Sequence, residues 1–153
     1  LYEADNARVP VVAELDPQCP PIQGDAQQLR QIIHNLVQNS QDATAQAQAQ
    51  APAVAGVAAL PAVHISTHWS AGAQRVRLCI SDSGSGFPAH ILQRAFEPYV
   101  TTKARGTGLG LAVVKKIADE HGARIDLTNR VDGGVVCGAQ VSLSFAIGHM
   151  VAF

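Results

Sequence analysis

Two asparagines stand one helical turn apart in the segment Asn35–Asn39, which reads Asn-Leu-Val-Gln-Asn. Residues four apart project from the same face of a helix. A carboxamide oxygen is a hard, neutral ligand that suits a magnesium ion whose other ligands are phosphate oxygens and water. The pair therefore suits a metal and phosphate site, although the pair taken alone favours ordinary hydrogen bonding along a helix face.

A second cluster, Asp82–Phe87, places an acid at the end of an expected strand and follows it with Gly84 and Gly86. A buried carboxylate there can accept a hydrogen bond from an exocyclic amine such as that of adenine. The glycines let the backbone approach a flat ring closely. This pattern predicts a base-binding turn, and an ordinary acidic turn is the alternative.

A third cluster, Gly106–Leu111, has alternate glycines at the start of an expected helix, with Lys103 and Arg105 just before it. Backbone N–H groups at a helix N-terminus favour an anion such as phosphate. The chain has no GxxxxGK[ST] loop, which excludes a Walker A site. The polar segment before Gly106 excludes the strand that a dinucleotide fingerprint requires.

The hydrophobic pattern predicts the elements that position these clusters. Strands are expected at 8–15, 63–69, 74–81, 123–129 and 138–146, and a short helix at 88–95. One long helix is expected to begin after Asp25, which can cap it, with Gln28 at the position that a capping box gives to Glu or Gln. A second is expected from Thr107 or Gly108 to His121-Gly122. This order predicts an α+β, two-layer sandwich with helices on one face of the sheet.

Helical periodicity also predicts which side chains face the core. The apolar arc of the first long helix consists of Leu29, Ile32, Ile33, Leu36 and Ala43. The arc beside it is polar and consists of Asn35, Asn39 and Asp42. The second long helix has a wide apolar face made of Leu109, Leu111, Val113, Val114, Ile117 and Ala118. The polar trio is therefore expected to border the core.

Length and composition narrow the class of protein. The 153 residues allow one domain, 1–153, and the net charge of −1 excludes a polybasic nucleic-acid surface. No stretch approaches the roughly 18 to 20 apolar residues that span a bilayer. Three cysteines without CxxC spacing favour buried thiols in a reducing compartment.

Residues 43–62 are rich in Ala and Gln and are interpreted as a tolerated low-complexity insertion that can extend the helix briefly. The chain begins at Leu1 and its only methionine is Met150, so we expect a piece of a longer protein.

Four segments, taken in chain order, resemble the N, G1, F and G2 boxes of sensor histidine kinases. They are the expected helix with Asn35 and Asn39, the turn Asp82–Phe87 (DSGSGF), Phe96–Tyr99, and the loop Gly106–Leu111 (GTGLGL). These boxes belong to the catalytic ATP-binding domain of the Bergerat-fold superfamily, with gyrase, Hsp90 and MutL. The resemblance covers about residues 8–145 and implies a mixed, mostly antiparallel sheet. The nitrogen-regulation type is most similar, because of the short lid and the phrase FEPYVTTKARGTGLGLAVVKKIADEHG.

This resemblance implies ATP and Mg²⁺ as cofactors and gives a role to each matching residue. Asn39 matches the magnesium-binding asparagine, with Asn35 as its support, and Asp82 matches the acid that binds the adenine amine. Gly84 and Gly86 shape the base pocket. The lid and the phosphate loop contribute Phe96, Lys103, Gly106, Gly108 and Gly110. Further nucleotide contacts are expected from Asp42, Thr102, Thr107 and Leu109, and the catalytic set is Asn35, Asn39 and Lys103. Tyr99 stands where the family usually has phenylalanine, and Gly138-Ala139 resembles its final glycine box.

The expected reaction follows from the absence of a glutamate at the position of the general base. ATP-hydrolysing relatives place a glutamate where this chain has Asn35, and the four glutamates lie elsewhere, at Glu3, Glu14, Glu97 and Glu120. Without that general base, transfer of the γ-phosphate to a nucleophile is favoured over hydrolysis.

In the family that this chain resembles, the phosphoacceptor histidine is followed by Glu or Asp. None of the six histidines of this chain is followed by either residue, so the resemblance implies that the acceptor lies elsewhere. His64 and His68 have a helical metal-site spacing but lie on an expected strand, which disfavours zinc. The expected partners are therefore an upstream dimerisation and phosphoacceptor domain and a response regulator, in the cytoplasm, without nucleic acid or membrane contact. A Bergerat ATPase, an anti-sigma serine kinase and a nucleotide-regulated binding module remain as alternatives.

Overall fold

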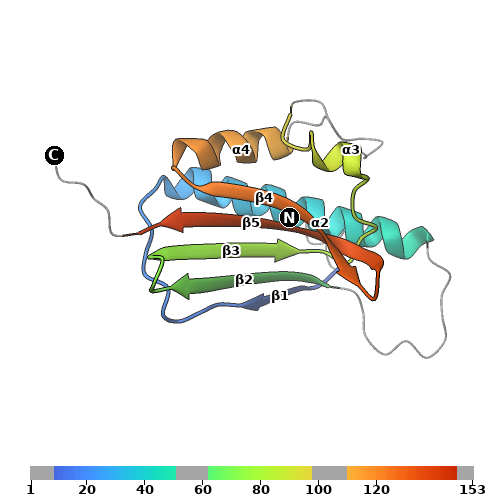
Figure 1. Ribbon diagram of the computed structural model, residues 1–153, viewed down its shortest axis with the longest axis horizontal. Coiled ribbons are helices and arrows are strands. Elements are labelled where there is room, and N and C mark those ends of the chain that lie inside the picture. The colour runs from blue at the N-terminus through green and yellow to red at the C-terminus, as the bar shows by residue number, and fades with distance from the viewer. Residues whose placement is uncertain (1–8, 51–61, 98–109, 148–153) are drawn as a thin grey trace.

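A five-stranded sheet forms one layer of the molecule (Figure 1). The structure, a computed structural model, describes residues 9–50, 62–97 and 110–147. The strands are β1 (Val11–Glu14), β2 (Val63–Ser70), β3 (Arg75–Ser81), β4 (Arg124–Asp132) and β5 (Val135–Ala146). Their spatial order is β1-β2-β3-β5-β4, with β1 parallel to β2 and every other pair antiparallel.

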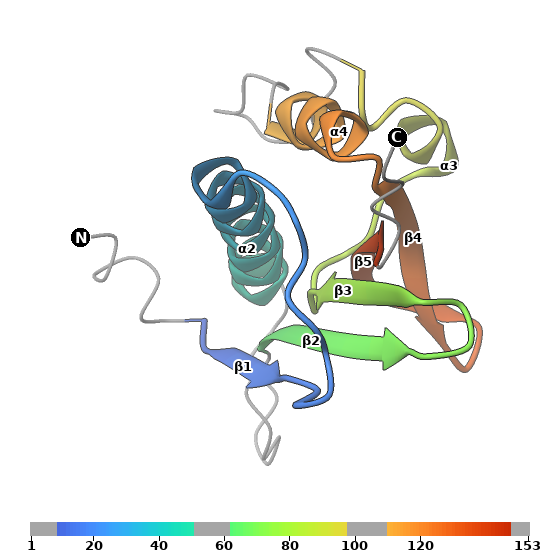
Figure 2. The same ribbon diagram turned by 90° about the vertical axis from the view of Figure 1, so that its left-hand side faces the viewer.

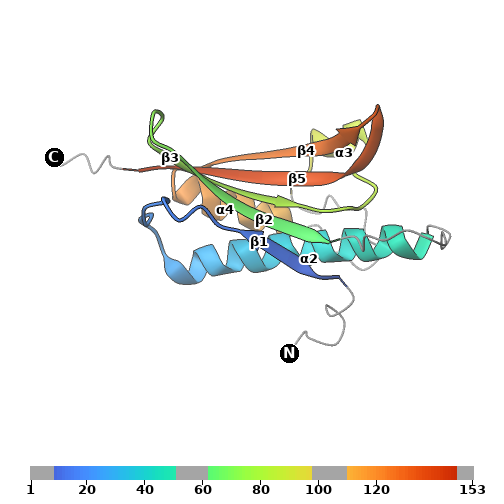
Figure 3. The ribbon, with the colours of Figure 1, turned by 90° about the horizontal axis from the view of Figure 1, so that it is seen from below.

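Helices form the second layer. The long helices α2 (Ala26–Gln50) and α4 (Gly110–Glu120) pack against each other and cover the same face of the sheet (Figures 2 and 3). The short helix α3 (Ala89–Leu92) follows β3 in the chain. The predicted α+β sandwich, with a mixed and mostly antiparallel sheet, is confirmed. None of the described helices has the length and apolar character needed to span a bilayer.

The core lies between the two layers and follows the predicted periodicity for the most part. Its fully buried members include Ile32, Leu36, Ile80, Val114 and Leu143. Ile33 was predicted to join them, but 40% of it is exposed. The buried arc shifts around α2 along its length, because this helix packs against α4 as well as against the strands. A single straight apolar stripe therefore misplaces one residue at the edge of the arc.

The β4–β5 hairpin is longer than the sequence predicts. Both strands continue to a two-residue turn, Gly133-Gly134, in which φ is 58° and 80°. Two consecutive positive φ values are those of a type I′ turn, whose twist matches that of the flanking strands. The sequence pattern places the end of the first strand at 129 and the start of the second at 138, because the residues between them do not alternate between apolar and polar. The valines near the turn are exposed; they are Val131, Val135 and Val136.

The N-terminus of α2 is capped as predicted, because the Asp25 carboxylate accepts hydrogen bonds from the backbone of Gln27 and Gln28. The predicted capping box is wrong. The backbone N–H of Asp25 donates instead to Nε2 of His121, at 3.0 Å, so it is not available to the Gln28 side chain. At its other end α2 continues to Gln50, so the first residues of the proposed insertion are helical.

The three thiols do not form disulfides, and each is half-buried rather than fully buried; they are Cys19, Cys79 and Cys137. His64 and His68 both lie on β2 and both are exposed. Residues four apart on a strand are separated by about 13 Å, so these two side chains do not share one metal ion. Among the described residues, no group of three or more potential ligands is clustered for a metal.

Candidate nucleotide-binding site

The first turn of α4 lies against the Asn side of α2. A Cβ atom added at Gly110 would stand 3.6 Å from Nδ2 of Asn39. Asn39 and Asn35 are half-buried, and Asp42 is exposed on the same helix. The N-terminal turn of a helix presents backbone N–H groups and a partial positive charge. The structure therefore brings a carboxamide next to a helix end that favours anions.

Asp82 lies in the turn that follows β3 and is only 6% exposed. Its Oδ1 accepts hydrogen bonds from the backbone N–H groups of Gly84, at 2.9 Å, and of Ala139, at 3.0 Å. Burial raises the pKa of this carboxyl, while the two N–H donors and the nearby Arg130 oppose the rise. The result is a carboxylate held by the backbone on one oxygen, in a site that disfavours its charge.

The backbone of the Asp82 turn packs directly on α2. A Cβ atom at Gly84 would lie 2.9 Å from Cβ of Ala43. The N–H of Ser83 also donates to Oγ1 of the fully buried Thr44, at 3.1 Å. Only glycine permits this approach at position 84 without displacing the helix. Ala43 and Thr44 belong to the segment that the sequence marks as insertion, and here they support the turn.

The predicted clusters converge along one side of α2. Asn39 meets Gly110, and Ala43, one helical turn later, meets Gly84. Phe96 is half-buried in the turn after α3. Six of the predicted site residues lie outside the described ranges; they are Thr102, Lys103, Gly106, Thr107, Gly108 and Leu109.

A comparison with known protein families identifies this arrangement. Residues 24–147 match the family described as histidine kinase-, DNA gyrase B- and HSP90-like ATPase. The chain belongs to this family. The match covers both long helices, the Asp82 turn and the sheet from β2 to β5.

Curated relatives are sensor histidine kinases by name. The chain is 34% identical over 119 residues to a putative NtrY-like sensor histidine kinase of Rickettsia bellii, covering 78% of this chain and 17% of that protein. It is 33% identical over 132 residues to the sensory histidine kinase/phosphatase NtrB of Rhizobium leguminosarum bv. phaseoli, covering 82% and 33%. The chain thus spans a third or less of the length of these relatives.

Solved structures share the fold. The nucleotide-free catalytic domain of histidine kinase ThkA superposes with a TM-score of 0.70 at 27% identity, covering 95% of this chain and 82% of that one. Full-length ShkA in complex with AMPPNP gives a TM-score of 0.70 at 24% identity, covering 94% and 28%. The second likeness shows the fold alone.

Two residues of β4 that sequence reasoning did not single out contact the Asp82 turn. Asn129 holds the backbone of Phe87 through two hydrogen bonds: its Oδ1 accepts from the N–H and its Nδ2 donates to the C=O, each at 2.8 Å. Arg130 donates from Nη1 to the backbone oxygen of Asp82. The available signal was Asn129 itself, a polar residue at the inward position that follows Ile125 and Leu127. A polar side chain at such a position needs a partner.

Proposed function

We propose that this chain is the ATP-binding catalytic domain of a two-component sensor histidine kinase. In this proposal it holds Mg-ATP and donates the γ-phosphate to a histidine on a separate domain of its parent protein. The observation that carries the proposal is that the turn after Asp82 and the first turn of α4 both pack on α2, with Gly84 against Ala43 and Gly110 beside Asn39. The sensor histidine kinase relatives support the choice of reaction.

Asp82 is assigned the adenine amine. Its Oδ1 is occupied by the N–H groups of Gly84 and Ala139, which fix the plane of the carboxylate. Its Oδ2 is then the oxygen that accepts from the base. Gly84 and Gly86 shape the pocket by letting the turn pack closely on the protein: a Cβ atom would lie 2.9 Å from Cβ of Ala43 at Gly84 and 2.5 Å from Cγ1 of Val136 at Gly86. An amine donor is recognised here, and the carbonyl that guanine has at the same position would be repelled.

Asn39 is assigned the magnesium ion, with Asn35 one turn earlier as its support. The residues fit this ion, because a neutral carboxamide oxygen is a hard ligand and the missing side chain of Gly110 leaves space beside it. When bound, the cation neutralises charge on the phosphates. Further contacts are proposed for Asp42 and Phe96. In the lid and the phosphate loop, nucleotide contacts are proposed for Thr102, Lys103, Gly106, Thr107, Gly108, Leu109 and Gly110.

Phosphoryl transfer is favoured over hydrolysis by the composition of α2. This helix contains no glutamate, and the position one turn before Asn39 is Asn35. An amide does not accept a proton from an attacking water, so the chain lacks the usual general base there. Transfer to a nucleophile needs mainly positioning and charge neutralisation. We infer that a phosphoacceptor domain and a response regulator are the partners, in the cytoplasm.

Titration calorimetry of ATP against this chain, with and without magnesium, tests the binding step. We expect binding that magnesium strengthens and no steady release of phosphate. Absence of ATP binding would contradict the proposal, and steady hydrolysis by the chain alone would replace it with an ATPase.

The transfer step needs the parent's phosphoacceptor segment and γ-labelled ATP. We expect acid-labile, base-stable label on a histidine. An unlabelled histidine at saturating Mg-ATP would favour a nucleotide-regulated binding module.

A further inference from the structure

The turn from Asp82 to Phe87 is fastened at both ends by the β4–β5 hairpin. At its first end, the N–H of Asp82 donates to the carbonyl of Ala139, at 2.9 Å, and Arg130 reaches the Asp82 carbonyl. At its last end, Asn129 pairs with the N–H and the C=O of Phe87. Asn129 and Ala139 are themselves neighbours across the hairpin. One piece of sheet therefore fixes both ends of the turn, and α2 holds the backbone of Ser83 and Gly84 between them.

The conformation of Gly86 depends on the same side chain. Gly86 has φ of +74°, a region that glycine adopts without strain. A Cβ atom there would lie 2.8 Å from Oδ1 of Asn129 and 2.5 Å from Cγ1 of Val136. The turn thus passes close over Asn129, and the amide decides where its backbone lies.

We propose that Asn129 is a positioning residue of the base pocket, and that it sets the preference for adenine by holding the turn in its binding conformation before nucleotide arrives. This inference rests on the proposed function, in which Asp82 and the two glycines form that pocket. Both hydrogen bonds of the Asn129 side chain go to Phe87, and not to the sheet that carries it. Its loss therefore frees the last end of the turn, at Gly86 and Phe87, while the β4–β5 ladder and the contacts of Asp82 remain.

The energetic reason is preorganisation. A turn that is already fixed does not lose conformational freedom when the base binds, so more of the contact energy appears as affinity. Adenine depends on the turn more than guanine does, because Asp82 accepts from the adenine amine and offers guanine no matching contact. Freeing the turn should therefore weaken ATP binding more than GTP binding.

The test compares Asn129→Ala with wild type in this chain. We expect ATP affinity to fall roughly tenfold, as for the loss of two neutral hydrogen bonds. GTP affinity, measured by displacement of bound ATP, should change by less, so that the ratio of the two falls. Thr128→Ala is the matched control, because Thr128 is the exposed neighbour on the opposite face of β4. It should bind both nucleotides as wild type does.

Thermal unfolding of each variant shows whether it is folded at the temperature of the titration. Asn129→Asp, which keeps the acceptor for the Phe87 N–H and loses the donor for its carbonyl, replaces the alanine variant if that one does not fold. ATP affinity within twofold of wild type in a folded variant would overturn the inference. An equal loss for ATP and GTP would also overturn it. If wild type itself does not bind ATP, the proposed function fails instead.

Discussion

His121 joins the two helices that border the site. Its Nε2 accepts the backbone N–H of Asp25 at the start of α2, and its Nδ1 lies 2.8 Å from the carbonyl of Ile117 near the end of α4. Since Nε2 accepts, the ring proton is on Nδ1, which donates to Ile117. Gly24 packs on the ring so closely that a Cβ atom there would lie 2.6 Å from Cδ2 of His121. The imidazole therefore sets the spacing of α2 and α4.

Replacing His121 with alanine should destabilise the fold. The change removes the acceptor of the Asp25 N–H and leaves a space beside Gly24, so we expect a loss of about 1 to 2 kcal/mol in the free energy of unfolding. Denaturant unfolding measures it. His90→Ala on the exposed side of α3 is the control and should match wild type. Equal stability of the two variants would show that the bridge contributes nothing.

Asp82→Asn should separate stability from nucleotide binding. An amide turned to accept from Gly84 and Ala139 leaves its donor end facing the adenine amine, which costs about 1 to 3 kcal/mol and weakens ATP binding roughly tenfold to a hundredfold. Because burial raises the pKa of Asp82, its ionised form costs stability at neutral pH, and a neutral amide removes that cost. We expect unfolding at no lower denaturant concentration than wild type. Asp126→Asn, on the exposed face of β4, should change neither property.

The raised pKa of Asp82 also predicts how ATP binding depends on pH. The carboxylate is the form that accepts from adenine, and it is lost as pH falls through the raised pKa. As pH is lowered, ATP affinity should therefore begin to decline at a higher pH than the titration of an ordinary aspartate, whose pKa is about 3.9, would give. The Asp82→Asn variant supplies the baseline, since it lacks this carboxyl and keeps every other titrating group of the protein and of the nucleotide. Parallel pH curves for the two proteins would exclude Asp82 as the titrating group.

Asn39→Ala should weaken Mg-ATP binding more than binding of magnesium-free ATP, because the lost ligand acts through the cation. Calorimetric titrations with magnesium and with a chelator give the two affinities. Gln38→Ala is a matched control, since Gln38 is the exposed neighbour on α2. Equal losses with and without magnesium would contradict the proposed role of Asn39.

Local sequence signals predicted most helices and strands and identified the three candidate clusters of site residues. The Asp25 cap, the glycines at 84 and 86 and the 3.6-residue period of α2 each act within a few residues, so their effects can be derived from the sequence alone. The packing of Gly84 and Gly110 on α2 agrees with the expectation that the clusters lie together, and their shared role in nucleotide binding stays a proposal.

Long-range contacts could not be derived in this way. Asn129 reaches Phe87 across 42 residues of chain, and Arg130 reaches Asp82 across 48. Nothing near either residue in sequence specifies its partner, because the pairing depends on the register of β4 with β5. The exposure of Ile33 likewise depends on how α2 meets its neighbours and not on its own period.

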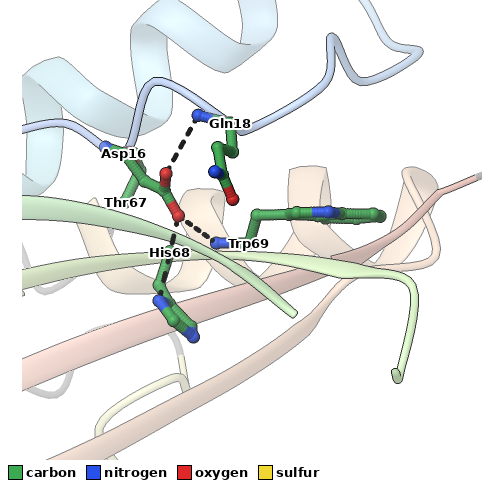
Figure 4. Close-up of polar contacts among 5 residues, drawn as sticks. All are labelled: Asp16, Gln18, Thr67, His68 and Trp69. Carbon is green, nitrogen blue, oxygen red and sulfur yellow. Dashed lines mark hydrogen bonds and ion pairs between the residues drawn. The ribbon is translucent and has the colours of Figure 1, made fainter. Parts of the chain in front are cut away.

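Asp16 anchors the loop that leads from β1 to α2 (Figure 4). Its carboxylate accepts from the backbone N–H groups of Trp69 and Gln18, each at 2.9 Å, and its own N–H donates to Oγ1 of Thr67. Nδ1 of His68 lies 3.9 Å from Oδ2. The Trp69 N–H, followed by that of Gln18, lowers the pKa of Asp16, and the exposed His68 adds to this when it is protonated.

A lowered pKa makes the contribution of Asp16 to stability depend on pH with a definite sign. The stabilisation is present above the pKa of the unfolded state, about 3.9, and is lost as pH falls through the lower folded value. Wild type should therefore exceed Asp16→Asn in unfolding free energy at neutral pH, and the gap should close below about pH 4. Trp69 is the only tryptophan, so its fluorescence reports unfolding next to the anchor. Asp132→Asn, at the exposed end of β4, should show no such gap, and a gap for Asp16→Asn that persists at low pH would mean that the carboxylate charge is not its source.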